Sequence, residues 1–242
     1  MINKIDTPLV SVIIHSYNRF EYLLNAIESI MHQTYDNFEI IVINDRSDQK
    51  EYFTHKFPSK VKLVHIGKNE HPDIPGSRQA LINIGSEISN GKYLAFLDDD
   101  DIWMPKKLEV QIKNMIEKKY KFSSTEGFYG TGVYDVKKKY NLYNREHFWE
   151  ILRKKYKRTR YLKIGKFPKI WKYGFIKIHN CIIKSSVIVE KDLFDGIGGI
   201  KSLPRNSDYD CWLTLLRTTN LLYIDEPLFY YDGGHGSGQK YL

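Results

Sequence analysis

Strand-like apolar runs alternate with segments of helical periodicity over about the first 120 residues, and this alternation constrains the fold more than any other feature. We expect strands at 9–14, 38–43, 61–66 and 92–97, and helices at 19–33, 47–57, 77–88 and 105–118. Repeated strand–helix units predict an α/β fold with a mostly parallel, Rossmann-like sheet and helices on both faces. The 242 residues are enough for one large domain or two small ones.

The second half of the chain is less regular. Strand-like pieces are expected near 128–136 and 176–183, a helix at 208–218, and a strand pair at 221–224 and 228–231. The sequence DGGHGSGQ follows from Asp232. Its glycines remove side-chain restrictions on the backbone, so we expect this tail to be mobile and to fold over a bound ligand.

Hydropathy and cysteine content narrow the setting. No apolar run approaches the length of about 18 residues that suggests a membrane-spanning helix. The N-terminal apolar stretch is not followed by the small-residue cleavage site of a signal peptide. Cys181 and Cys211 are too few for a disulfide scaffold or a four-cysteine zinc site, and we expect them to be small buried residues. These features predict a cytoplasmic protein.

The positive charge is concentrated in one segment, residues 137–177. This basic segment holds fifteen Lys and Arg against two acidic residues, a net charge of +13, which leaves −5 for the rest of a chain whose total is +8. It predicts a polyanionic partner: an anionic lipid surface, a nucleic acid or a phosphorylated substrate. Tyr161, Phe167, Trp171 and Tyr173 are interleaved with the charges and could insert into a bilayer surface. A merely solvated insertion is the alternative.

Four consecutive aspartates, 98–101, directly follow the fourth predicted strand. Ligands of open α/β sheets bind beyond the carboxyl ends of the strands, and carboxylates placed there suit a hard divalent cation that neutralises phosphate. The simpler alternative is an acidic turn that interacts with the dipole of the following helix. Polar residues also follow the first two strands, at 15–19 and 44–47. Clusters at three strand ends predict a shared binding edge.

Several of these segments together resemble the nucleotide-binding half of family 2 glycosyltransferases, which have the GT-A fold. The resemblance rests on SVIIHSYNR, IVINDRS, PGSRQALINIG and GKYLAFLDDDDIWMPKKLE, and continues in NSDYDCWLTLLR and PLFYYDGGHGSG. It covers about residues 8–125 and 178–238 and does not cover the basic segment. It implies a single GT-A domain over 1–242, with a nucleotide-binding half at about 1–125 and an acceptor-side half at 126–242.

The resemblance also implies roles for individual residues. The nucleotide-sugar pocket would be lined by Ser16, Tyr17, Arg19, Asp45, Arg78, Asp98 and Asp99. Within it, Asp45 would bond the base, usually uracil. Asp100 would bind Mn²⁺ or Mg²⁺, His235 would close over the diphosphate or complete the metal shell, and Asp208 would be the general base. The chain departs from the family pattern at His15, Arg46, Ser207 and Asp232, where proline, glycine, an acid and a basic residue are usual.

The residues and the resemblance together predict an inverting, metal-dependent transfer of a sugar from a nucleotide-diphospho-sugar, with UDP as the expected nucleotide. The implied acceptor is a hydroxyl of a glycan or lipid-linked glycan in surface polysaccharide or lipo-oligosaccharide synthesis, at the inner face of the membrane. One rival is an aspartate-nucleophile phosphohydrolase, because Asp98 and Asp100 fit its strand-end pattern. The other is a nucleic-acid-binding protein that uses the basic segment, although no nucleic-acid module is recognised.

Overall fold

The computed structural model describes residues 7–67, 80–162 and 165–234. Their strands are β1 Val10–Ser16, β2 Phe38–Asn44, β3 Val61–His65, β4 Tyr93–Asp98, β5 Ile102–Trp103, β6 Phe122–Gly130, β7 Asn141–Leu142, β8 Ile170–Trp171, β9 Ile188–Glu190 and β10 Leu221–Asp232. The α-helices are α1 Phe20–Met31, α2 Glu51–Thr54, α4 Ile82–Glu87, α5 Lys107–Lys118, α6 Trp149–Tyr156, α7 Tyr173–Ile176, α8 Lys191–Gly196 and α9 Ser207–Thr218. A π-helical turn η1, Tyr143–His147, and a 3₁₀ turn η2, Lys184–Ser186, complete the set.

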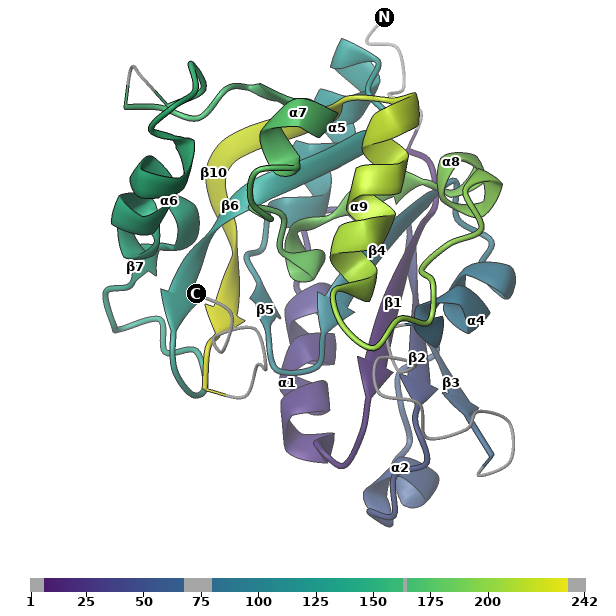
Figure 1. Ribbon diagram of the computed structural model, residues 1–242. Coiled ribbons are helices and arrows are strands. Elements are labelled where there is room, and N and C mark those ends of the chain that lie inside the picture. The colour runs from purple at the N-terminus through teal and green to yellow at the C-terminus, as the bar shows by residue number, and fades with distance from the viewer. Residues whose placement is uncertain (1–6, 68–79, 163–164, 235–242) are drawn as a thin grey trace, which may run out of the picture.

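The strands form one sheet in the order β3-β2-β1-β4-β9-β6-β10-β5, with β7 on β6 and β8 on β10 (Figure 1). The first four of these neighbours run β3, β2, β1 and β4 in parallel, while β9 pairs antiparallel with both β4 and β6. The α/β fold with a largely parallel sheet is therefore confirmed. All four parallel strands point their carboxyl ends to the same edge, where the candidate site lies.

Two hydrophobic clusters fill the space between the sheet and its helices. On one face, Val12 and Ile14 of β1 pack in the cluster that contains the apolar sides of α1 and α5. On the other face, Ile13 belongs to the cluster that contains α8 and α9, and α4 also lies on that side (Figure 1). A Cβ on Gly85 of α4 would lie 2.6 Å from a methyl carbon of Ile13. Glycine therefore lets this helix approach the strand closely.

The irregular second half differs from the sequence-based expectation in three places. The strand expected near 128–136 lies earlier, as β6, and 176–183 is not a strand, because Cys181 and Ile182 are buried in irregular backbone. The expected pair at 221–224 and 228–231 is one long strand, β10, whose pairing with β6 shifts register around Pro227. Proline has no N–H to donate, so the irregularity sits where the ladder cannot continue.

Two smaller predictions are also wrong. The helix expected from Ser47 to Phe57 is only the four residues of α2, and the Ser47 hydroxyl instead accepts a hydrogen bond from the backbone N–H of Asn18 at 2.9 Å. In the basic segment, Phe167 and Trp171 are buried in the core rather than available to a bilayer. Their burial follows from packing against each other, with ring centroids 5.7 Å apart, and against neighbouring aromatic rings. Both cysteines are free and buried, as expected.

The helices of the described residues are too short and too polar for any of them to cross a bilayer.

Candidate active site

The ends of β1, β2 and β4 meet at one edge of the sheet. Ser16 is in register with Asn44, and His15 with Asp98. The backbone N–H of Asp45 donates to the carbonyl of Ser16 at 2.9 Å, which fixes the turn after β2 against β1. Because these contacts are backbone pairings of parallel strands, the three polar clusters singled out in the sequence are held side by side.

Asp99 and Asp100 are held by groups from the first strand–helix unit. The Ser16 hydroxyl donates to Asp99 Oδ2 at 2.8 Å and is itself hydrogen-bonded to the Tyr52 hydroxyl. Arg19 Nη1 lies 3.3 Å from Asp99 Oδ1 and 2.7 Å from Asp100 Oδ2. Ser16 is fully buried, so its hydroxyl positions Asp99 from within the protein and does not line an open surface.

The carboxylates of this turn repel one another. Burial first, and then the charges of Asp98 and Asp99, raise the pKa of Asp100 to about 7, while Arg19 acts in the opposite direction. Burial also raises the pKa of Asp99, against the Ser16 hydrogen bond and the Arg19 charge. A site of this kind favours an added cation, because positive charge would relieve the repulsion.

Asp45 is almost completely buried and lies between two basic side chains. Arg46 Nε donates to its Oδ1 at 3.1 Å, and His15 Nε2 lies 3.7 Å from its Oδ2. Burial alone would raise the pKa of this carboxyl, but His15 and Arg46 outweigh it and lower the pKa. Arg46 has a φ of 60°, in the left-handed region. A glycine would adopt this backbone more easily, but it would lose the contact with Asp45.

Asp101 has a structural environment that differs from that of its three neighbours. Its side chain is fully buried, and it accepts hydrogen bonds from the Ser185 hydroxyl at 2.5 Å and from the backbone N–H of Asp232 at 3.0 Å. The Ser185 hydroxyl also accepts from the backbone N–H of Asp98 at 3.0 Å. These contacts tie the acidic turn to η2 and to the end of β10, so Asp101 holds the turn in place.

Lys184 connects the acidic turn with the start of α9. It is buried and forms an ion pair with Asp98 Oδ1. Burial alone would lower the pKa of Lys184, but attraction to Asp98, Asp208 and Asp99 raises it, so the amine stays charged. Burial raises the pKa of Asp208, while the Lys184 charge acts against that rise. One buried cation therefore serves carboxylates from β4 and from α9.

The structure separates Asp208 from its competitor Asp210. Asp208 is half-buried, and its Oδ1 accepts a hydrogen bond from the backbone N–H of Tyr209 at 2.8 Å. Asp210, two residues further along α9, is paired with the exposed Lys201 at 3.3 Å. Asp208 is thus the carboxylate of α9 that is coupled to the acidic turn.

The remaining residues implied by the resemblance are placed unevenly. Tyr17 follows β1 and is 38% exposed, so its ring is accessible at the edge. Arg78 and His235 lie outside the described residues. Within the described ranges, His, Cys, Asp and Glu side chains form no group of three arranged to hold a metal ion.

Lys184, Ser185 and Asp101 are site residues whose roles sequence reasoning missed. Lys184 and Ser185 stand in the run CIIKSSVIV, where a lysine between apolar residues could have been noticed as a cation that folding would bury. No spacing, however, indicates that its partners are 86 residues before it and 24 residues after it in the chain.

We expect Lys184→Met to lower activity and to shift the acidic limb of the pH–rate profile to higher pH. Without the nearby cation the raised pKa of Asp208 rises further, so a base at this position ionises only at higher pH. Loss of the buried pair should also reduce the free energy of unfolding by about 1–3 kcal/mol, less than for a fully dry pair because Asp98 is 30% exposed.

The matched control is Lys184→Arg, which keeps the charge and should restore the position of the limb. Rates and denaturation curves for both variants across pH 5–9 provide the measurement. An unchanged limb in Lys184→Met would show that Lys184 does not act on the titrating base.

Solved structures identify the class of fold. The fold matches that of S. aureus TarS in complex with UDP-GlcNAc, with a TM-score of 0.66 and 15% identity. The match covers 96% of this chain and 61% of the TarS chain. The mannosyltransferase PcManGT from Pyrobaculum calidifontis, in complex with GDP-Man and Mn²⁺, matches with a TM-score of 0.63 and 15% identity. The match covers 95% of this chain and 58% of that one. At such identities the likeness shows the fold, which is GT-A.

The chain belongs to glycosyl transferase family 2, whose sequence model matches residues 11–187. It is 33% identical over 220 residues to an uncharacterised glycosyltransferase of Methanocaldococcus jannaschii, covering 88% of this chain and 66% of the relative. It is 30% identical over 227 residues to WfgD of Escherichia coli, a UDP-Glc:alpha-D-GlcNAc-diphosphoundecaprenol beta-1,3-glucosyltransferase, covering 91% and 74%. The chain spans less than two thirds of several relatives, down to 16% of a Rickettsia bellii glycosyltransferase.

Proposed function

We propose that this protein is an inverting, divalent-metal-dependent glycosyltransferase. It transfers a sugar from a nucleotide-diphospho-sugar, with UDP as the nucleotide, to a hydroxyl of a glycan or lipid-linked glycan in the synthesis of a surface polysaccharide or lipopolysaccharide. The observation that carries the proposal is the coupling of two acidic centres, the turn at 98–101 and Asp208, through the buried Lys184. Family membership supports the reaction type, and the UDP-sugars named for WfgD and TarS support the donor.

In this proposal the donor lies across the strand edge. The exposed ring of Tyr17 stacks on the base, a contact that every base can make with an aromatic face. Asp45, kept ionised by Arg46 and His15, accepts from a base N–H. Arg19 lies close to Asp99 and Asp100, where its guanidinium can also contact a phosphate oxygen.

Asp208 is the proposed general base. An inverting displacement needs one carboxylate to take the proton of the acceptor hydroxyl as the new bond forms. The raised pKa of Asp208 makes it a stronger base than an ordinary aspartate, and Lys184 opposes its protonation. Membership of glycosyl transferase family 2 disfavours the phosphohydrolase alternative, in which Asp98 would be the nucleophile.

The acidic turn fits Mn²⁺ or Mg²⁺ by its donor chemistry. Carboxylate oxygens are the ligands that these hard cations prefer. Burial, followed by the charges of Asp98 and Asp99, raises the pKa of Asp100, and this supports the proposal because a bound cation would offset both effects. Asp100 would hold the cation, assisted by Asp99, and His235 remains a proposed further ligand. When bound, the cation would stabilise the departing nucleoside diphosphate.

A thermal-shift screen tests the proposal. UDP-, GDP- and dTDP-sugars are compared with and without Mn²⁺, and the UDP-sugars with Mn²⁺ should raise the melting temperature most. A ligand at a hundred times its Kd adds about 2.7 kcal/mol of stability, which such a screen resolves easily. A larger shift with GDP-sugars would replace UDP, and the absence of any shift would contradict the proposal.

We infer further that the basic segment holds the enzyme at the anionic inner face of the cell membrane, where a lipid-linked acceptor is presented. Each Lys or Arg close to such a surface contributes about 1 kcal/mol. Reversal of Arg153, Lys154, Lys155, Lys157 and Arg158 to Glu should abolish sedimentation with anionic liposomes and leave activity on a short soluble acceptor largely intact. Wild-type protein that ignores these liposomes at low salt would refute the inference.

A further inference from the structure

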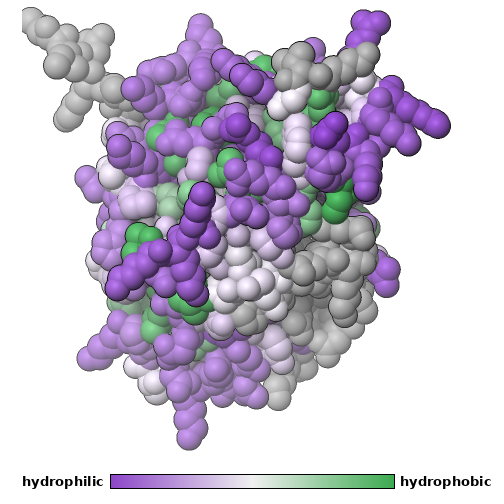
Figure 2. Space-filling view, turned by 90° about the vertical axis from the view of Figure 1, so that its left-hand side faces the viewer, coloured by the Kyte–Doolittle hydropathy of each residue, from purple (hydrophilic) through white to green (hydrophobic). Residues whose placement is uncertain are grey.

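A cavity of about 390 Å³ lies within the basic segment, on and after α6. Its lining includes Trp149, Arg153, Tyr156, Lys157, Thr159 and Leu162. It shares none of these residues with the sheet edge that carries the aspartates. Figure 2 views the side of the molecule on which α6 lies, where hydrophilic side chains surround small hydrophobic patches. The volume lies in the range of small-molecule sites.

The walls of the cavity are held by the core. The Tyr156 hydroxyl donates to the carbonyl of Phe175 at 2.9 Å. The rings of Tyr156 and Phe175 are stacked, with their centroids 4.8 Å apart. Trp149 packs edge-on against Phe167 at 5.6 Å, but remains partly exposed. Leu162 is buried. The cavity therefore has a preformed wall with both aromatic and aliphatic surface.

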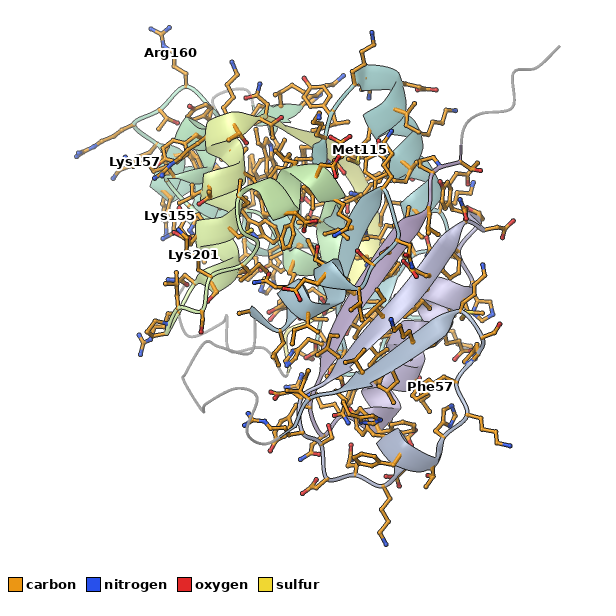
Figure 3. All side chains as sticks on the ribbon, turned by 90° about the vertical axis from the view of Figure 1, so that its right-hand side faces the viewer. Phe57, Met115, Lys155, Lys157, Arg160 and Lys201 are labelled. Atoms are coloured by element: carbon orange, nitrogen blue, oxygen red, sulfur yellow. The ribbon has the colours of Figure 1, made fainter. Side chains whose placement is uncertain are left out.

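The cationic groups of the cavity are weakly engaged. Arg153 Nη1 lies 3.1 Å from Glu150 Oε1, and the two side chains are 60% and 71% exposed. Such a surface pair contributes at most about 1 kcal/mol and can yield to a stronger anionic ligand. Lys157 projects outward in Figure 3, as do Lys155 and Arg160. Two cations thus stand beside an apolar wall.

We propose that this cavity is a binding site for a phosphate group that carries an apolar chain. Arg153 and Lys157 bind the phosphate, since a guanidinium can make two parallel hydrogen bonds to its oxygens and an ammonium adds a point charge. Trp149 and Leu162 contact the first part of the chain. A membrane phospholipid and a lipid-linked saccharide both present this chemistry. The site goes beyond the proposed transfer reaction and does not depend on it.

The alternative is diffuse attraction, in which every cation of the segment counts equally. Helix α6 itself supplies a matched comparison. Lys154 and Lys155 are exposed residues of the same helix and do not line the cavity. Arg153→Ala/Lys157→Ala and Lys154→Ala/Lys155→Ala each remove two positive charges, and alanine favours a helix. A specific site distinguishes the two pairs, whereas diffuse attraction does not.

Binding can be followed by the fluorescence of Trp149, because the other three tryptophans, Trp103, Trp171 and Trp212, are buried. The full chain is titrated at 150 mM salt with dihexanoyl phosphatidic acid below its micellar concentration, with inorganic phosphate and with dihexanoyl phosphatidylcholine. We expect saturable binding of the phosphatidic acid and at least tenfold weaker binding of the other two. Arg153→Ala/Lys157→Ala should weaken the binding at least tenfold, and Lys154→Ala/Lys155→Ala less than twofold.

Equal weakening by the two double variants, or equal affinity for inorganic phosphate and the amphiphile, would overturn the site. Circular dichroism of both variants checks that α6 is intact. Sedimentation with phosphatidylcholine vesicles that contain either phosphatidic acid or a polyprenyl diphosphate then identifies the source, and preference for either supports the site. Because none of these readouts requires sugar transfer, failure here is distinguishable from failure of the proposed reaction.

Discussion

Asp208→Asn is expected to slow sugar transfer at least about 10²-fold, the usual contribution of a general base, while donor binding is retained. The amide has nearly the same shape as the carboxylate and can still accept the hydrogen bond from the backbone N–H of Tyr209. It cannot take a proton from the acceptor hydroxyl. Donor binding by calorimetry and transfer by product release are measured on the same preparation.

Asp210→Asn is the control for this experiment. It changes the same chemical group on the same helix but removes only a half-exposed ion pair with Lys201. We expect transfer within about threefold of wild type, since such pairs contribute at most about 1 kcal/mol. If Asp210→Asn is crippling and Asp208→Asn is mild, the base has been assigned to the wrong carboxylate.

Asp100→Ala is expected to reduce transfer by about 10²-fold or more, because cation stabilisation of the leaving group is worth several kcal/mol. The Mn²⁺ dependence of nucleotide binding should disappear with it. The fold should not suffer: a carboxyl whose pKa is raised on folding is destabilising when ionised, so its removal at neutral pH should leave the metal-free protein at least as stable. Near-normal turnover in Asp100→Ala would contradict the proposal that Asp100 binds the metal.

The substitution of the neighbouring residue, Asp101→Ala, should instead lower the stability of the fold. Burial, followed by the charges of Asp98 and Asp100, raises the pKa of Asp101 well above its usual range, so at neutral pH the substitution removes a neutral carboxyl and relieves no charge. It leaves the Ser185 hydroxyl and the backbone N–H of Asp232 without their buried acceptor. An unsatisfied buried donor costs about 1–3 kcal/mol, so unfolding should occur at clearly lower denaturant concentration. Adjacent aspartates would then differ in kind, one affecting metal dependence and the other stability.

The first half of the fold was predictable because its signals are local. The strands at 9–14, 38–43 and 92–97 are short apolar runs that are mostly buried on both faces, and 61–66 forms a half-buried strand at the edge of the sheet. The helices at 19–33 and 105–118 show their own periodicity. The strand-end position of Ser16, Asp45 and the four aspartates then follows from the topology of a parallel sheet.

The second half was not predictable in the same way, since its order depends on partners far away in the chain. Ile176, Cys181 and Ile182 are buried without forming a strand, because they belong to the core cluster that also contains residues of α6, α7 and α9. Lys184 is recognisable as a site residue only when Asp98 and Asp208 are seen beside it. The alternation of charges and aromatics in 137–177 suggested a surface, but half of the aromatic residues it named, Phe167 and Trp171, belong to the core.

The hydrogen bond between Asp101 and the end of β10 has a consequence for biosynthesis. The accepting carboxylate of Asp101 leaves the ribosome 131 residues before Asp232, whose backbone N–H donates the hydrogen bond. The parallel strands β1 to β4 can pair while translation continues, but β6 keeps an open edge until β10 arrives. A nascent or truncated chain without β10 would therefore combine an unfinished acidic turn with an unpaired strand. Only after β10 has been synthesised can this one strand both complete the pairing of β6 and secure the turn.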